Sequence, residues 1–290
     1  MTGVARTGDT PAVEGQAPLL DCRDLVVTFP SKRGGEPFTA VDHASLSVRS
    51  GEVVGLVGES GSGKSTIARA VVGLQPLDSG VISFMGEDLT GRRTIAQRSG
   101  MQMVFQDPYG SLDPRMSIRG TLSEMVRRHT PLRGQEVERR CLELLDLVAL
   151  PSAILDSRPA GMSGGQRQRV AIARALSAGP RLLVADEAVA ALDVSVQAGI
   201  VNLLADLRRD VGLSILFISH DLSIVRTLCD RVAVIHLGRI VEEQPCADLY
   251  ANPQQEYTKA LLGAIPRLHA RRGNASPPAA AWAAAPAGAQ

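Results

Sequence analysis

Short hydrophobic runs alternate with stretches of helical spacing along most of the chain. Two of the runs, Leu182–Ala185 and Ile215–Ile218, are apolar at every position, and a strand of this kind is covered on both of its faces. Strands that alternate with helices are typical of a parallel or mixed sheet with helices packed against it. We predict strands at Asp24–Phe29, Ala40–Val48, Glu52–Val57, Val81–Phe84, Met101–Phe105, Arg181–Ala185, Ser214–Ile218 and Arg231–His236.

The stretch at about 107–162 has few strand signals and a helical pattern instead. Within it, the spacing of three and four residues that places side chains on one helix face is followed by Val137, Cys141, Leu144, Leu145 and Val148. This stretch therefore predicts an inserted helical subdomain. A shorter helical pattern at about 246–266 is expected to pack on the main body.

Both ends of the chain lack a regular hydrophobic pattern. Residues 1–18 are mostly small or polar, and residues 267–290 end in a run dominated by Ala and Pro. Segments of this composition do not bury enough apolar surface to fold, so we expect both to be disordered. The folded unit is then 19–266.

The composition is that of a globular protein of balanced charge. Lys and Arg number 31 against 30 Asp and Glu, a net charge of +1, and 44% of the residues are hydrophobic. This balance argues against a nucleic-acid coat protein, and no run has the length of a membrane-spanning helix or the pattern of a signal peptide. We expect free thiols in a reducing compartment, because no C-x-x-C spacing joins Cys22, Cys141, Cys229 and Cys246.

A glycine-rich segment carries the pattern G-x-x-x-x-G-K-[ST]. It lies between the predicted strand Glu52–Val57 and a helical run, Ile67–Leu74, which is the context that a P-loop requires. Its backbone N–H groups face an anion, Lys64 adds charge for the β- and γ-phosphates, and Ser65 can ligate Mg²⁺. The sequence therefore predicts a site for a magnesium nucleoside triphosphate at Gly58, Glu59, Ser60, Gly61, Ser62, Gly63, Lys64, Ser65 and Thr66.

Two further predicted strands end in polar side chains. The strand Arg181–Ala185 is followed by Asp186 and Glu187, and the strand Ser214–Ile218 leads to His220. Ligands of open α/β sheets bind at the carboxyl ends of strands, so we predict that Asp186 holds Mg²⁺ and that Glu187 orients or deprotonates the attacking water. His220 would hydrogen-bond the γ-phosphate or that water. The simpler interpretation is a pair of ordinary exposed acids and a surface or capping histidine.

A serine before two glycines opens another helical run. Ser163, Gly164, Gly165 and Gln166 are followed by the helical segment Arg167–Leu176. A hydroxyl and free N–H groups at a helix start can bind an anion, although ordinary helix caps look similar. Together with the P-loop, this motif resembles the signature of the ATP-binding cassette (ABC) family.

The resemblance to the ABC family covers about 19–266 and implies both a fold and an assembly. The fold would be α/β, with a P-loop NTPase (RecA-like) core, an antiparallel β subdomain and an inserted helical subdomain. Two cassettes of this family close head-to-tail around two ATP molecules, and the signature of each binds the nucleotide held by the other. Gln106 is similar to the catalytic-site glutamine that contacts Mg²⁺ and reports to a membrane partner, and Asp193 to the aspartate of the loop that crosses the dimer interface.

Longer matches narrow the resemblance. The segments Val104–Met116, Ala191–Gln197 and Asn252–Leu262 are similar to those of the oligopeptide/dipeptide/nickel importer ATPases. This subfamily implies an ATP-hydrolysing subunit of a membrane transporter that imports peptides or similar small solutes, bound at the cytoplasmic face of the cell membrane. The implied partners are a second ABC ATPase subunit, identical or different, transmembrane permease subunits and, indirectly, a solute-binding receptor, without nucleic acid.

Some positions depart from the family pattern and leave alternatives open. Ala188 and Ala190 stand where Pro and Ser are usual, which gives slight support to a regulatory cassette that binds ATP without hydrolysing it. A soluble ABC-type ATPase of DNA repair, chromosome organisation or translation is the other alternative, but the gap between the two nucleotide motifs is too short for the coiled coils of chromosome and repair relatives. Phe29 or Phe38 is the candidate to stack on adenine, and core packing would explain either aromatic equally well.

Overall fold

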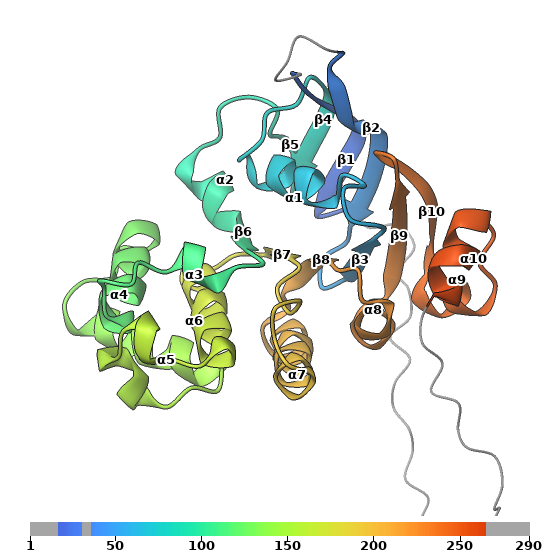
Figure 1. The fold of residues 1–290 in the computed structure, drawn as a ribbon. Helices are drawn as coiled ribbons and strands as arrows, with labels where there is room; N and C mark the ends of the chain where they lie inside the picture. Colours follow the sequence, from blue (N-terminus) through green and yellow to red (C-terminus); the bar gives the residue numbers. More distant parts are fainter. Residues whose placement is uncertain (1–16, 31–35, 265–290) are drawn as a thin grey trace, which may run out of the picture.

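The computed structural model describes residues 17–30 and 36–264, so most of the two ends expected to be disordered, 1–18 and 267–290, lies outside the described residues. Its strands are β1 Leu20–Phe29, β2 Phe38–Val48, β3 Val53–Val57, β4 Ser79–Phe84, β5 Glu87–Asp88, β6 Met101–Val104, β7 Leu182–Asp186, β8 Ser214–Ile218, β9 Arg231–His236 and β10 Arg239–Pro245. They form two sheets (Figure 1). One is antiparallel, in the order β2-β1-β4-β5, and the other is mixed, in the order β10-β9-β3-β8-β7-β6.

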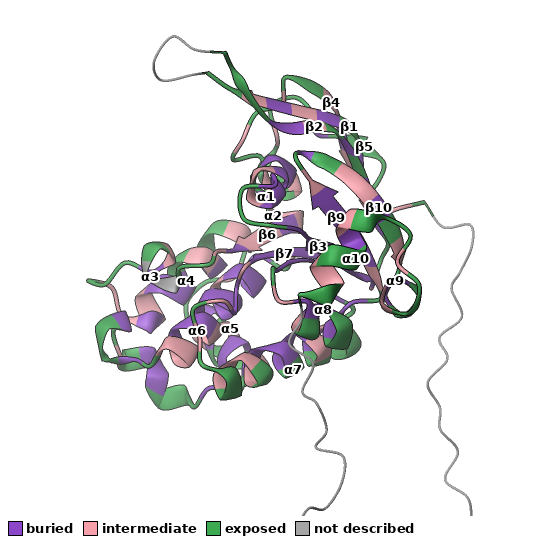
Figure 2. Ribbon diagram, turned by 45° about the vertical axis from the view of Figure 1, so that its right-hand side comes forward, coloured by how far each residue is buried: buried purple, intermediate pink, exposed green. Residues whose placement is uncertain are grey.

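The mixed sheet has a parallel centre. Strand β3 pairs in parallel with β8 and β9, and β7 pairs in parallel with β8 and β6, whereas β10 runs antiparallel to β9. Every residue of β3, β7 and β8 is buried (Figure 2), as their continuous apolar runs predicted. Because parallel strands end at the same edge of a sheet, the residues that follow these three strands are neighbours.

Helices cover both faces of this sheet (Figure 1). They are α1 Lys64–Val72, α2 Ile95–Gly100, α3 Pro108–Ser111, α4 Ile118–His129, α5 Gln135–Leu147, α6 Gly164–Leu176, α7 Val194–Val211, α8 Leu222–Leu228, α9 Cys246–Ala251 and α10 Glu256–Gly263, with short 3₁₀ helices at Ser152–Asp156 and Pro159–Gly161. Helix α1 lies between the two sheets, where Ile67 and Val71 join a core shared by both. The opposite face packs against α6, α7 and α8 through a second core that includes Ile172, Leu204 and Val225.

The chain between β6 and β7 is helical. Helix α5 buries Val137, Cys141, Leu144 and Leu145, so the helix that their spacing predicted is confirmed, and it packs against α4 and α6. Helix α9 lies against β9 and β10. Among the described helices, none is both long enough and apolar enough to cross a membrane.

All eight predicted strands are present, with ends that differ by no more than four residues, but two strands were missed. Strand β5 has only two residues, too few for a pattern. Strand β10 reads Arg-Ile-Val-Glu-Glu-Gln-Pro and lies at the edge of the mixed sheet. Edge strands carry charged residues and proline because these discourage further strand pairing, and the same residues concealed this strand in the sequence.

Candidate nucleotide-binding site

The predicted P-loop joins the carboxyl end of β3 to the start of α1. Gly63 precedes the helix with a φ of 107°, a conformation that L side chains rarely adopt, and a Cβ atom there would lie 2.3 Å from the carbonyl oxygen of Ala40. A Cβ atom on Gly58 would lie 2.2 Å from the carbonyl oxygen of Ile235. The loop therefore needs glycine at both positions, because backbone from β2 and β9 closes directly around it.

Lys64 folds back into this loop. Its Nζ donates to the carbonyl oxygens of Gly58 at 2.8 Å and Glu59 at 2.6 Å, and the residue is only 4% exposed. Burial lowers the pKa of the Lys64 ammonium, and the carboxylates of Glu187 and Asp186 oppose that shift. The ammonium is thus held beside the positive end of the α1 dipole, where an anion would be attracted by both.

Ser65 and Asp186 bring two oxygen donors together from different elements. The Ser65 hydroxyl on α1 donates to Oδ1 of Asp186, the last residue of β7, at 2.9 Å. Burial raises the pKa of the Asp186 carboxyl, the Ser65 hydrogen bond opposes the shift, and the charge of Glu187 adds to it. A hydroxyl and a carboxylate are donors that a hard divalent cation accepts, and such a cation would favour the charged form of Asp186. These residues therefore fit Mg²⁺.

Glu187 has an unusual backbone conformation at the end of β7. Its φ is 48°, in the left-handed region, and its N–H donates to the carbonyl oxygen of Ile218 on β8 at 3.0 Å. Non-glycine residues in this region are uncommon and concentrate at functional sites. The turn brings the Glu187 carboxylate to His220, whose Nδ1 lies 3.4 Å from Oε1.

Two cavities lie beside these side chains. The first, of about 350 Å³, is lined by residues of the P-loop together with Phe29, Phe38, Gln106 and Glu187. The second, also of about 350 Å³, is lined by Ser65, Asp186, Gln106 and neighbouring residues. Gln106 therefore borders both spaces, two residues after the end of strand β6. Phe29 and Phe38 are paired on β1 and β2, and both candidate aromatics line the first cavity.

The predicted signature residues lie at the start of α6. The Ser163 hydroxyl accepts from the Gln166 N–H at 3.2 Å, and Oε1 of Gln166 accepts from the Ser163 N–H at 2.9 Å, which is a capping box. Asp193 caps the neighbouring helix α7 by accepting from the Val196 N–H at 2.9 Å. A Cβ atom on Gly165 would lie 2.5 Å from the side chain of Val196, so the two helix starts are in close contact.

This signature does not border the P-loop of its own chain. Among the described residues that line the two cavities, none belongs to Ser163–Gln166, and Asp193 is also absent. Ser163, Gln166 and Asp193 are exposed or partly exposed at the surface. The structure of one chain thus brings together Lys64 and Asp186 but leaves the signature apart from them.

One residue at this site had no role in the sequence analysis. The Glu59 N–H in the P-loop donates to the hydroxyl of Tyr257 on α10 at 3.1 Å. Tyr257 belongs to the segment Asn252–Leu262, which the sequence offered only as a subfamily match. That match was the available signal, but nothing in the spacing indicated that α10 reaches the P-loop.

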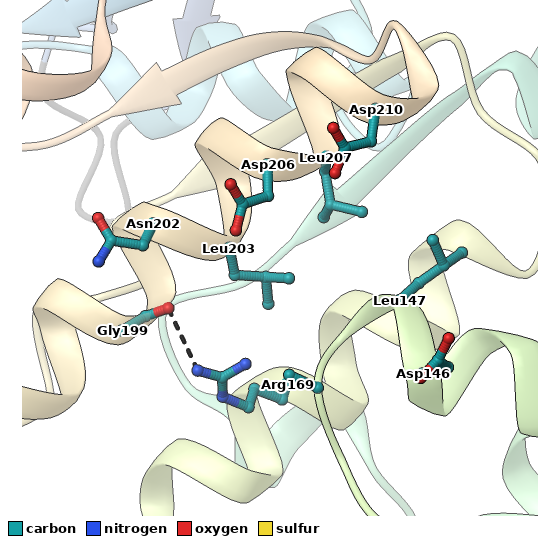
Figure 3. A pocket seen from close by; sticks show the side chains of 10 residues that line it. Asp146, Leu147, Arg169, Gly199, Asn202, Leu203, Asp206, Leu207 and Asp210 are labelled. Carbon is teal, nitrogen blue, oxygen red and sulfur yellow. Dashed lines mark hydrogen bonds between the residues drawn. The ribbon is translucent and has the colours of Figure 1, made fainter.

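Another cavity, of about 490 Å³, lies away from this site, between α5, α6 and α7 (Figure 3). Arg169 of α6 borders it and donates to the carbonyl oxygens of Val148 at 2.7 Å and Gly199 at 3.2 Å. Asp206 and Asp210 of α7 line the same space. Arg169 thereby links α6 to the chain after α5 and to α7. No residue predicted for the nucleotide site lines this cavity.

Comparison with known proteins assigns the chain to a family. Residues 41–190 match the model of the ABC transporter family. The chain is 43% identical over 262 residues to the oligopeptide transport ATP-binding protein OppF of Lactococcus lactis subsp. lactis (strain IL1403), an alignment that covers 88% of this chain and 82% of the relative. It is 47% identical over 270 residues to a putative peptide import ATP-binding protein of Brucella abortus (strain 2308), covering 90% and 80%. The chain therefore belongs to the ABC transporter family.

Solved structures agree with this assignment. The dimeric post-hydrolysis state of the ATP-binding cassette MJ0796 bound to ADP and Pi superposes with a TM-score of 0.69 at 26% identity, covering 78% of this chain and 98% of that one. The structure of cbiO1 from Clostridium perfringens, part of the ABC transporter complex cbiONQ, gives a TM-score of 0.71 at 27% identity, covering 82% and 92%. The predicted fold class and the resemblance to the ABC family are both confirmed.

Proposed function

We propose that this chain is the ATP-hydrolysing subunit of a membrane transporter that imports peptides or similar small solutes. The observation that carries the proposal is the convergence of Lys64, Ser65, Asp186, Glu187 and His220 on one edge of the sheet, beside a cavity. The names of the relatives, oligopeptide transport and peptide import ATP-binding proteins, support the transported class.

The phosphates of ATP would bind at the P-loop and the start of α1. Lys64 would exchange its two carbonyl partners for β- and γ-phosphate oxygens, and backbone N–H groups of the loop would bind the same anion. Ser65, Asp186 and Gln106 would hold Mg²⁺, which supplies charge neutralisation at the phosphate oxygens. Phe29 and Phe38 border the same cavity and would contact the adenine ring.

Hydrolysis would depend on Glu187. Its carboxylate would orient the attacking water and accept its proton, and His220, 3.4 Å from that carboxylate, would hydrogen-bond the γ-phosphate or the water. The hydrogen bond from the Glu187 N–H to Ile218 holds the base in place between two strand ends. Catalysis would rest on positioning and electrostatic stabilisation of the transferred phosphoryl group.

The working assembly would contain two cassettes. The signature residues Ser163, Gly164, Gly165 and Gln166, which lie apart from the P-loop of their own chain, would bind the nucleotide of a second ABC subunit, and Asp193 would lie at the interface. The dimeric structures of a related cassette support this arrangement. The pair would bind transmembrane permease subunits near Gln106, at the cytoplasmic face of the membrane, with a solute-binding receptor acting through the permease.

Glu187→Gln tests the proposal directly. The variant should bind ATP as the wild type does but lose steady-state hydrolysis by about a hundredfold or more, because the amide accepts no proton from water. ATP binding is measured by calorimetry and hydrolysis by phosphate release. Glu143→Gln, an exposed glutamate on α5 that pairs with Arg140, is the matched control and should hydrolyse ATP normally. Hydrolysis at the wild-type rate by Glu187→Gln would contradict the assignment of the base.

The same assay separates the alternatives that the sequence left open. A regulatory cassette would bind ATP without hydrolysing it even in the wild type, and the presence of both Glu187 and His220 at the site argues against it. A soluble ATPase of repair, chromosome organisation or translation is not favoured, because the relatives reported above are named for peptide import.

A further inference from the structure

Tyr257 of the C-terminal helix α10 forms a hydrogen bond with the P-loop. The Tyr257 hydroxyl accepts a hydrogen bond from the Glu59 N–H at 3.1 Å. The Tyr257 ring stacks on His236 of β9, with ring centroids 3.9 Å apart and planes inclined by 35°. The packing of the Tyr257 ring on His236 therefore holds the hydroxyl in position to accept this hydrogen bond.

The peptide group that Tyr257 contacts also contacts Lys64. The N–H of Glu59 and the carbonyl of Gly58 belong to the same planar peptide unit. Tyr257 binds the N–H side of this unit, and Lys64 Nζ donates to its carbonyl oxygen at 2.8 Å. A rotation of this peptide unit would therefore move the acceptor of the phosphate-binding lysine.

Helix α10 is fixed to the sheet where Tyr257 lies. Glu242 on β10 is 8% exposed, and its carboxylate accepts from the N–H groups of Gln254 at 2.7 Å and Gln255 at 3.0 Å, directly before the helix. The turn between β9 and β10 also reaches the loop, because the Gly238 N–H donates to the carbonyl oxygen of Ser62 at 3.0 Å. Helix α10 and the β9–β10 hairpin thus hold the P-loop from outside the cavity.

We propose that Tyr257 is a positioning residue of the nucleotide site, through which the C-terminal helical segment sets the geometry of the P-loop and its affinity for nucleotide phosphates. The inference rests on the proposed nucleotide function of the loop. Tyr257 lines neither cavity that we describe at the site, so it acts through the Gly58–Glu59 peptide rather than on the nucleotide. Without the hydroxyl, the P-loop would sample more conformations. Nucleotide binding would then have to restrict them, which costs affinity.

Tyr257→Phe tests this inference, with Tyr250→Phe as its matched control. Both variants remove one hydroxyl hydrogen bond from the C-terminal helices, but the Tyr250 hydroxyl donates to the carbonyl oxygen of Leu222 rather than bonding to the P-loop. Tyr257→Phe keeps the ring that stacks on His236. It should raise the Kd for magnesium ATP about fivefold, the equivalent of one ordinary hydrogen bond, whereas Tyr250→Phe should leave the Kd unchanged.

Steady-state kinetics of the full chain give a second measurement. Tyr257→Phe should raise KM for ATP with little change in kcat, because the base and its neighbours are untouched. If Tyr257 had only a structural role, Tyr257→Phe would lower the melting temperature and leave KM for ATP unchanged. Equal Kd and KM values in the two tyrosine variants would overturn the inference while the nucleotide function stands. Failure of the wild type to bind ATP, with Lys64→Ala giving the same signal, would instead overturn the proposed function.

Discussion

At the level of single residues, steric limits require glycine in the P-loop. Gly63 combines a positive φ with a carbonyl oxygen 2.3 Å from where its Cβ would be. Glu187 also has a positive φ, yet it carries a full side chain. A strained non-glycine residue persists only where the surroundings hold it, and the hydrogen bond to Ile218 is one such restraint.

Gly63→Ala should therefore disable the loop. The positive φ alone costs about 1–3 kcal/mol for a residue with a Cβ, and the contact with Ala40 forces β2 or the loop to move. We expect a lower free energy of unfolding in urea and loss of ATP binding by calorimetry. Gly91→Ala is the control, because its Cβ would meet no atom within 4 Å and its φ is not positive. Normal ATP affinity in Gly63→Ala would show that the loop tolerates the shift.

At the level of elements, a largely buried ion pair within the mixed sheet is linked to the antiparallel sheet through Arg231. Glu52 precedes β3, and its carboxylate accepts from Arg231 of β9 at 3.0 Å and from the Arg49 N–H at 2.7 Å. Arg231 also donates to the carbonyl oxygen of Ser47 on β2 at 2.7 Å. Burial by itself raises the pKa of the Glu52 carboxyl, but the hydrogen bonds and charges of Arg231 and Arg49 outweigh it, so that this pKa lies below its ordinary value.

The contribution of the Glu52–Arg231 pair to the free energy of unfolding should depend on pH, and Glu52→Gln tests this. At neutral pH the variant should lose about 2 kcal/mol of unfolding free energy, because Arg231 loses a charged acceptor. The folded state lowers the Glu52 pKa, so the stabilisation is present above about pH 4.5, the ordinary value, and is lost as the pH falls through the lower folded value. The difference from wild type should shrink accordingly in urea titrations at successive pH values.

Asp206→Asn is the comparison for this measurement. Asp206 pairs with Arg209 on α7, and both side chains are more than half exposed. An exposed pair contributes little, so this variant should stay close to wild type at neutral pH. A Glu52→Gln variant that is equally close to wild type would show that the Glu52–Arg231 pair does not stabilise the fold.

At the level of the whole molecule, the signature faces outward. Ser163 caps α6 and borders neither cavity at its own P-loop. If it binds the nucleotide of a second chain, Ser163→Arg should reduce hydrolysis by about a hundredfold and leave ATP binding to the same chain's P-loop intact. Phosphate release and calorimetry measure the two effects.

A mixture of the variants Ser163→Arg and Lys64→Ala tests the shared site more directly. Ser163→Arg keeps an intact P-loop, and Lys64→Ala keeps an intact signature, so a mixed head-to-tail pair contains one complete site. Hydrolysis should return in the mixture although each variant alone retains little or no activity. Full activity of Ser163→Arg by itself would contradict a site shared between two chains.

Much of the site could be predicted because its parts are local in sequence. The P-loop is one continuous segment between a strand and a helix, and Asp186 and Glu187 directly follow a run that is apolar at every position. Parallel strands end at a common edge, so these residues had to be neighbours. Strand β10 escaped prediction because charges and a proline at the sheet edge conceal its alternation.

The sequence by itself determined the class of fold, the glycine-rich loop between β3 and α1, and the acids at the strand ends, because a few adjacent residues specify each turn and each buried strand. Only the tertiary structure decided which distant groups meet. The contact between Glu59 and Tyr257 joins residues 198 positions apart, and the ion pair between Glu52 and Arg231 joins residues 179 positions apart. Such contacts depend on how complete elements pack, and no local pattern of side chains encodes that packing.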